Sequence, residues 1–237
     1  MMYQALAAYY DELVGDEATT DFWKRELEKQ IGSGSILEYA CGSGDMAIAL
    51  AKDGYTVTAG DISQAMLESA KAKPGSELVS WQLQDMCAPS KVWEHYDSAI
   101  CLCDSFNYLL EDEQVSAFFH NVYQVLKPGG CFIFDTHSLD RLQEFEDEYL
   151  EEGTLHEVQY EWSILAQDEY LYQNFLFFDE AGATHHEQHI QRVYHPSFLE
   201  AQLQECGFSW TVMTDFKTPG IQPGEKYFYL ARKGTSV

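Results

Sequence analysis

Short apolar runs and amphipathic helical patterns alternate along the first half of the chain. The apolar runs are too short for helices and are bounded by glycine, proline or acidic residues, so they predict strands. The segments between them carry apolar residues at a spacing of three or four, which predicts helices. This alternation is typical of an α/β fold with a parallel sheet. The predicted strands are 36–40, 55–60, 78–83, 97–103 and 131–137, and the predicted helices are 3–14, 19–30, 45–52, 63–73 and 112–126.

The pattern changes after His137. A strongly acidic stretch, 138–152, predicts one more helix. Apolar and polar residues then alternate strictly, which predicts antiparallel strands. The three predicted strands are 155–165, 170–178 and 184–194, and a helix over 196–206 and two strands over 208–216 and 226–232 follow.

These segments predict one domain with an insertion. We expect residues 1–137 and 196–237 to form the main domain, with its N-terminal helices as a cover, and 138–195 to form a substrate lid. At 46% hydrophobic residues and a length of 237, the chain can bury a sizeable core.

A glycine turn follows the first predicted strand directly. Gly42 and Gly44 let the backbone bend and let a ligand approach where a Cβ would intrude. The helix that follows starts with its free N–H groups facing that ligand. Asp61, at the end of the second strand, is placed to bind a ribose hydroxyl pair. A nucleoside-bearing cofactor is therefore predicted at this turn.

Two acidic positions favour S-adenosylmethionine over a dinucleotide. Glu38 precedes Gly42 by four residues, where it can meet a cationic amino group and would repel a pyrophosphate. Asp85 and Met86 end the third strand, where an acid and an apolar residue suit the amino group and ring of adenine.

Four motifs together resemble those of the class I S-adenosylmethionine-dependent methyltransferases, in the branch of small-molecule N-methyltransferases. They are Glu38-x-Ala40-Cys41-Gly42-x-Gly44, Asp61-Ile62-Ser63-x-x-Met66, Asp85-Met86 and Leu126-Lys-Pro-Gly-Gly. The resemblance implies a Rossmann-like, doubly wound, seven-stranded sheet with a three-stranded antiparallel insertion after strand 5. It also implies N-terminal helices over the cofactor. The cofactor contacts that it implies are Tyr10, Trp23, Glu38, Ala40, Cys41, Gly42, Gly44, Asp61, Ile62, Met66, Asp85, Met86 and Leu102.

The charge of the chain narrows the choice of acceptor. Binding to nucleic acid depends on Lys and Arg at the phosphates, and this chain has 14 basic residues against 39 acidic ones, a net charge of −25. A nucleic-acid substrate is therefore disfavoured, and a small neutral or cationic acceptor fits better.

The expected compartment is cytoplasmic. No apolar segment approaches the length of a membrane span, the N-terminus lacks the pattern of a secretory signal, and the six cysteines lack a disulfide pattern. We expect a monomer or a homodimer.

The acceptor is expected at the carboxyl ends of the strands, where ligands bind in open α/β sheets. His137 is the first candidate for a general base and Asp104 the second, as a clamp on a cationic amine. The substrate-binding candidates are Asn107, Tyr108, Arg192 and Tyr194.

The run from His185 to His189 raises the question of a metal. Strand alternation puts His185, Glu187 and His189 on one face, as in a two-His, one-carboxylate site, but the spacing is not that of a zinc site. We expect no metal.

The predicted function is transfer of a methyl group from S-adenosylmethionine to nitrogen or oxygen of a small molecule. The alternatives are a nicotinamide-dependent oxidoreductase and a regulator that binds S-adenosylmethionine without catalysis.

Overall fold

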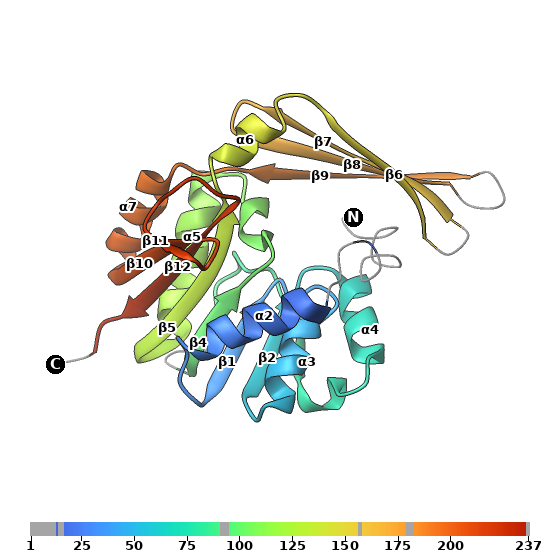
Figure 1. Ribbon diagram of the computed structural model, residues 1–237. Coiled ribbons are helices and arrows are strands. Elements are labelled where there is room, and N and C mark those ends of the chain that lie inside the picture. The colour runs from blue at the N-terminus through green and yellow to red at the C-terminus, as the bar shows by residue number, and fades with distance from the viewer. Residues whose placement is uncertain (1–12, 14–16, 91–94, 156–157, 179–182, 236–237) are drawn as a thin grey trace.

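The structure is a computed structural model, and it describes residues 13, 17–90, 95–155, 158–178 and 183–235. Within these residues the chain forms two sheets, a large one flanked by helices and a smaller one above its edge (Figure 1). Most of the predicted helix over 3–14 lies outside the described residues.

The large sheet has the strand order β11-β10-β12-β5-β4-β1-β2-β3 within the described residues. Strands β1 to β5 pair in parallel, whereas β12 runs antiparallel to both β5 and β10. The order reverses at β1, which lies between β2 and β4, and such a switch point opens a crevice at the carboxyl ends of the strands. The bounds are β1 Ser35–Tyr39, β2 Thr56–Asp61, β3 Ser80–Leu83, β4 Tyr96–Cys101, β5 Leu126–His137, β10 Phe208–Thr214, β11 Thr218–Pro219 and β12 Lys226–Lys233.

Local signals fix where the helices begin and end. The Ser63 side chain accepts a hydrogen bond from Met66 N at the start of α4, and Glu111 and Gln114 form a capping box on α5. The last long helix, α7, has a proline in its first turn and ends at Gly207 in the left-handed conformation. The helices are α2 Glu17–Glu28, α3 Asp45–Lys52, α4 Gln64–Ala72, α5 Asp112–Val125, α6 Asp140–Glu144 and α7 Pro196–Cys206, with short 3₁₀ turns η2 Ser76–Leu78 and η3 Ser105–Tyr108.

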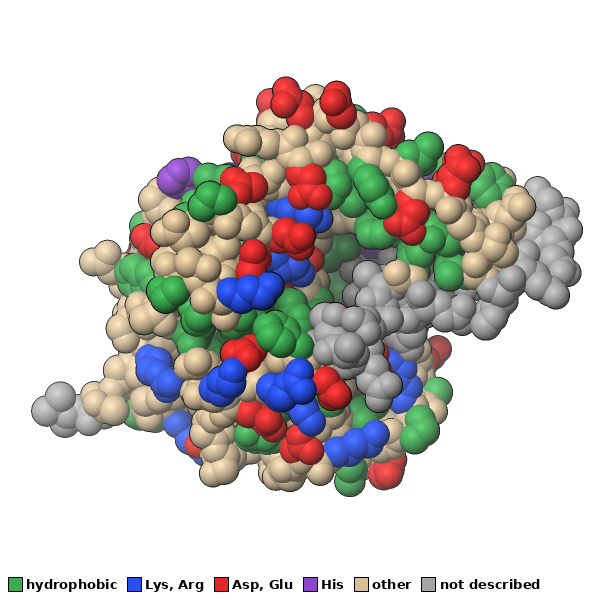
Figure 2. All heavy atoms as spheres, in the orientation of Figure 1, with side chains coloured by type: hydrophobic (Ala, Val, Ile, Leu, Met, Phe, Trp, Pro, Cys, Tyr) green, Lys and Arg blue, Asp and Glu red, His purple; other side chains and the backbone are tan. Residues whose placement is uncertain are grey.

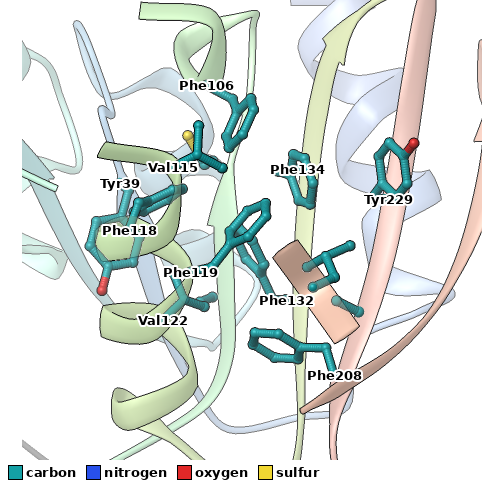
Figure 3. Packing of buried hydrophobic residues seen from close by; sticks show 14 of the residues in the cluster. Tyr39, Phe106, Val115, Phe118, Phe119, Val122, Phe132, Phe134, Phe208 and Tyr229 are labelled. Atoms are coloured by element: carbon teal, nitrogen blue, oxygen red, sulfur yellow. The ribbon is translucent and has the colours of Figure 1, made fainter. Parts of the chain in front are cut away.

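The core lies on both faces of the large sheet. On one face, β5 contributes Phe132 and Phe134 to an aromatic cluster with Phe118 and Phe119 of α5 and Tyr229 of β12 (Figure 3). Ring pairs such as Phe134–Tyr229, with centroids 5.1 Å apart, fill this layer. On the other face, aliphatic residues of β1, β2 and β5 pack against α2, α3 and α4. Two buried faces confirm the doubly wound α/β class.

The second sheet is larger than the three strands predicted. Its order is β6-β7-β8-β9, with β6 Tyr149–Leu155, β7 Val158–Gln167, β8 Tyr170–Phe178 and β9 Thr184–Arg192. The helix predicted over 138–152 was wrong beyond Glu144, because residues 149–155 pair with β7 as a charged edge strand. The large sheet also gains the two-residue strand β11, which pairs with β10 and was not predicted.

Gly44 tests the packing at the start of α3. It has φ +80°, and an added Cβ would lie 2.9 Å from Ala70 Cβ and closer still to the Trp81 ring. Gly54 has φ +94° with open space around it, so it is a matched control for backbone strain alone. We expect Gly54→Ala to cost about 1–2 kcal/mol of unfolding free energy and Gly44→Ala about 1–3 kcal/mol more. Urea unfolding of both variants measures the difference, and equal losses would contradict the packing described.

Candidate active site

A cavity of about 290 Å³ opens at the carboxyl ends of β1, β2 and β4. Residues from these three strand ends, from α2 and from the start of α3 surround it. It brings together eleven of the predicted cofactor residues: Trp23, Glu38, Ala40, Cys41, Gly42, Asp61, Ile62, Met66, Asp85, Met86 and Leu102. Tyr10 lies outside the described residues, and Gly44 does not line the cavity.

The glycine turn is held open by a carboxylate. Asp61 accepts hydrogen bonds from Gly42 N and Ser63 N, each at 2.8 Å, so it ties the turn to the end of β2. Gly42 has φ +53°, and an added Cβ there would meet no protein atom within 4 Å. That empty space belongs to the cavity, so the turn is a cradle that a side chain would fill.

Glu38 is a buried acid with an unsatisfied oxygen. Its side chain is 4% exposed, and its Oε2 has no hydrogen-bond partner among the described residues. Burial, reinforced by the charges of Asp45 and Asp61, raises the pKa of Glu38 to about 8. A cationic group in the cavity would satisfy this oxygen and favour the ionised carboxylate.

A second cavity, of about 150 Å³, lies between the strand ends and the second sheet. Trp162, Phe175 and Phe145 form its aromatic walls. Cys103 and Tyr108 line both cavities, so the two adjoin. Figure 2 shows the surface hollowed between the second sheet and the main body, with acidic and basic side chains beside the hollow.

A charge cluster of one buried and two partly exposed residues borders the second cavity. Lys226 Nζ lies 2.7 Å from Asp104 Oδ2 and 3.4 Å from Asp135 Oδ2, and Asp104 N donates to Asp135 at 3.0 Å. Burial would raise the pKa of Asp104, but two positive charges, those of His137 when protonated and of Lys226, hold this pKa below its usual range. Burial raises the pKa of Asp135 and lowers that of His137, so His137 is neutral near pH 7.

Hydrogen bonds fix which ring nitrogen of His137 carries its proton. Trp162 Nε1 can only donate, and it donates to Gln173 Oε1. Gln173 Nε2 then donates to Gln191 Oε1, and Gln191 Nε2 donates to the Asp104 carbonyl, which can only accept. Gln191 Oε1 must therefore also accept the hydrogen bond from His137 Nε2, at 3.0 Å.

His137 Nδ1 consequently carries a lone pair. It lies 3.4 Å from Asp104 Oδ1, and neither atom has a hydrogen-bond partner among the described residues. Both residues line the second cavity. Two acceptors that converge in this way need a donor between them, which a ligand in the cavity can supply.

Three predicted substrate residues lie outside both cavities. Arg192 is held by Asp112 at 2.8 Å and by the Leu110 carbonyl, and Tyr194 is buried with its hydroxyl on the Leu109 carbonyl. Asn107 is fully buried and anchors η3 to Thr136 and to the Arg192 carbonyl. Arg192 lies outside because β9 turns its other face, with Gln191, toward the cavity, whereas Asn107 and Tyr194 are buried and bonded to other parts of the chain.

His185, Glu187 and His189, the set considered for a metal, differ in their surroundings. His185 is exposed, whereas Glu187 and His189 are buried. No group of three or more His, Cys, Asp or Glu in the described part of the chain is arranged to hold a metal ion.

Sequence reasoning missed Lys226, Gln173 and Gln191. Lys226 opens β12, which is distant in sequence from Asp104 and Asp135, so only the strand pairing brings it to them. The alternation of Glu187, His189 and Gln191 along β9 was a usable signal, because it marks three polar side chains on one buried face.

Known proteins place this chain in a family. A family model described as a methyltransferase domain matches residues 36–130. The protein YqeM of Bacillus subtilis (strain 168), which is named as a methyltransferase, is 32% identical over 246 residues and covers 100% of this chain and 99% of its own length. A solved S-adenosylmethionine-dependent methyltransferase from Clostridium acetobutylicum superposes with a TM-score of 0.83 at 24% identity, over 98% of this chain and 99% of its own. The sugar N-methyltransferase KedS8 from Streptoalloteichus gives a TM-score of 0.80 at 15% identity, over 99% of this chain and 94% of its own.

The fold and the glycine turn define a class I methyltransferase. The chain belongs to the methyltransferase family and is an enzyme that depends on S-adenosylmethionine. The predicted family, fold class and cofactor are thus confirmed, and the two alternatives, an oxidoreductase and a non-catalytic regulator, are wrong.

The cradle at Gly42 can be tested by filling it. Gly42→Ala should lower the affinity for S-adenosylhomocysteine at least tenfold, because the new methyl group enters the cavity. Its cost in stability should stay near the roughly 1–2 kcal/mol of a left-handed alanine. Calorimetric titration and urea unfolding measure the two effects, with Gly54→Ala as the control that changes stability alone. Wild-type affinity in Gly42→Ala would place the cofactor elsewhere.

Proposed function

We propose that this enzyme transfers a methyl group from S-adenosylmethionine to the nitrogen of a small primary amine bound in the second cavity. The observation that carries the proposal is the pair of converging acceptors, Asp104 Oδ1 and His137 Nδ1. A hydroxyl has one hydrogen and can donate to only one of them. A neutral primary amine has two N–H groups and can donate to both while its lone pair stays available for attack.

The first cavity has the groups that the cofactor requires. Glu38 would bind the cationic amino group of the methionine part, Asp61 the ribose hydroxyls, and Ile62 and Met86 the adenine ring. The empty cradle at Gly42 would admit the cofactor backbone. The bound cofactor supplies an electrophilic methyl group, and the protein's task is to hold the acceptor at attack distance in a dry cavity.

The walls of the second cavity support a small cationic or neutral acceptor. Trp162, Phe175 and Phe145 exclude water and offer aromatic faces to a cation. The net charge of −25 favours a cationic amine in the same way that it disfavours nucleic acid. KedS8, the structural neighbour named above, is itself described as a sugar N-methyltransferase.

The setting that we propose is the cytoplasm, in which the six cysteines, all free in the structure, stay reduced. No helix in the described part of the chain is long and apolar enough to cross a membrane. We propose that the enzyme is a monomer or a homodimer. We also propose the predicted division into a main domain and the inserted lid 138–195, because strands of the insertion form a sheet of their own.

The proposed reaction is tested with a panel of small primary amines, the matching alcohols and the matching quaternary ammonium salts. Formation of S-adenosylhomocysteine and of the methylated product is followed by mass spectrometry. We expect turnover with amines alone. Turnover of the alcohols in preference to the amines would overturn the assignment to nitrogen.

His137→Gln should separate acceptor binding from cofactor binding. The variant can keep a donor at the Nε2 position, facing Gln191, but it loses the Nδ1 acceptor, so turnover of a responding amine should fall about 10²-fold or more. Affinity for S-adenosylhomocysteine should stay within about twofold, because His137 does not line the first cavity. A loss of both affinities together would indicate a structural role for His137.

The raised pKa of Glu38 predicts proton release on cofactor binding. The ionised carboxylate binds the ligand's cationic amino group, so below pH 8 the free protein must lose a proton when the ligand binds. Affinity for S-adenosylhomocysteine should therefore rise from about pH 6 to about pH 8. Calorimetry near pH 6.5 in two buffers of different ionisation enthalpy measures the released proton. Glu38→Gln should bind more weakly and release none, and a wild-type affinity that does not vary with pH would contradict the contact.

A further inference from the structure

The buried face of β9 carries two polar side chains, Glu187 and His189, that have no role in the proposed function. Glu187 and His189 are 8% and 1% exposed, and they lie two residues apart on that face. His189 Nε2 lies 3.2 Å from Glu187 Oε1. On the other side of the ring, His189 Nδ1 lies 2.9 Å from the Tyr108 hydroxyl.

These contacts give the row of polar side chains a direction. The Glu187 carboxylate lies at ion-pair distance from Nε2, without the geometry of a hydrogen bond, and its negative charge favours the hydrogen of His189 on that nitrogen. Nδ1 then accepts, and the Tyr108 hydroxyl must donate to it. A phenol that donates its hydrogen presents oxygen lone pairs to its other neighbours.

Tyr108 stands where the two cavities meet, since it lines both. Asn107, next to it in η3, is fully buried and fixes this turn through Thr136 and the His137 backbone N–H. The His189 ring is in turn held by edge contacts with Tyr108 and Phe175, at centroid distances of 5.7 and 5.5 Å. The three polar side chains are therefore positioned by packing as well as by each other.

An amine acceptor must lose a proton before it can be methylated, and a row of hydrogen-bonded side chains can take up that proton. A primary amine is an ammonium ion in water near pH 7, and its three N–H groups leave no lone pair for attack. Asp104 and His137 hold two of these N–H groups, and the third must lose its proton. His137 is a poorer site for that proton than a free imidazole, because burial, together with the Lys226 charge, outweighs the neighbouring Asp104 charge and lowers the pKa of His137.

We propose that Tyr108, His189 and Glu187 form a proton relay that deprotonates the bound ammonium group before methyl transfer. The inference rests on the proposed function. The third N–H bond breaks, its electron pair stays on nitrogen, and its proton goes to the Tyr108 oxygen. The phenolic proton of Tyr108 moves to His189 Nδ1, and the imidazolium that results is balanced by the Glu187 carboxylate. The freed lone pair is the nucleophile, and it forms where the third proton was, at the junction of the cavities.

In this relay Tyr108 is the catalytic residue, because it touches the acceptor. His189 and Glu187 are positioning residues that act through it. The relay also accounts for the polar run of β9 without a metal.

The first test needs no acceptor. Nitrogen-15 NMR of the histidine rings in the complex with S-adenosylhomocysteine reports which ring nitrogen is protonated, and His189→Gln identifies the signal. We expect His189 to carry its hydrogen on Nε2 alone in the parent protein. Glu187→Gln should let the other tautomer appear. A proton on His189 Nδ1, or a tautomer that Glu187→Gln leaves unchanged, would overturn the relay.

The second test uses benzylamine as the acceptor probe, which suits a small cavity with aromatic walls. Tyr108→Phe should lower kcat about 10²-fold or more, with KM for benzylamine and affinity for S-adenosylhomocysteine within about twofold. Tyr172→Phe and His186→Gln change the same residue types on β8 and β9 outside both cavities, and they should behave as the parent. A kcat for Tyr108→Phe equal to that of Tyr172→Phe would overturn the relay. If the parent does not methylate benzylamine, that result counts against the proposed function, and the ring tautomers still decide the relay.

Discussion

The carboxyl edge of the large sheet depends on the ion pairs of Lys226 with Asp104 and Asp135. They join the ends of β4, β5 and β12, so one parallel pair and one antiparallel pair of strands are fixed at the same place. Asp135 is fully buried, whereas Lys226 and Asp104 are partly exposed, so removal of Lys226 would leave the Asp135 charge uncompensated in the interior. Such a cluster contributes little net stability, and its value lies in fixing where Asp104 points.

The backbone around the cluster supports the same conclusion. Cys103 and Asp104 both have positive φ angles, 58° and 59°, and Ala40 has 51° at the end of the neighbouring strand. This conformation raises the energy of a non-glycine residue, and the residue adopts it only where the surrounding structure imposes it. Here the surroundings are the two cavities, since all three residues line one or the other. Three of the six non-glycine residues with positive φ in the described part of the chain therefore border the cavities.

More of the residues predicted to bind the cofactor than of those predicted to bind the acceptor line a cavity. The predicted cofactor residues lie in short segments whose spacing is set by a strand, a turn and a helix, so local rules suffice to bring Glu38, Gly42 and Asp61 together. The second cavity is lined by residues of β5, β7, β8, β9 and η3, and β5 and η3 are distant from β9 in the sequence. Alternation on β9 showed which residues share a face, but the packing of the second sheet decided which face was buried. Arg192 was assigned to the substrate for that reason, and Gln191 was overlooked. The helix predicted over 138–152 was wrong beyond Glu144 for a related reason. The backbone hydrogen bonds of an edge strand are made with a neighbouring strand, here β7, and local composition does not reveal that partner.

The second sheet supplies what the large sheet lacks for binding a particular acceptor next to the first cavity. The large sheet supplies fixed charges and lone pairs at its edge, and these cannot by themselves exclude water or select a shape. β7 and β8 supply aromatic walls, while β9 supplies polar groups on its buried face, one of which, Gln191, orients His137. Gln191 also bonds to Gln173 and, through it, to Trp162, so the wall and the polar pair are parts of one hydrogen-bond network. A change in the wall would therefore alter the proton position on His137 as well as the shape of the cavity.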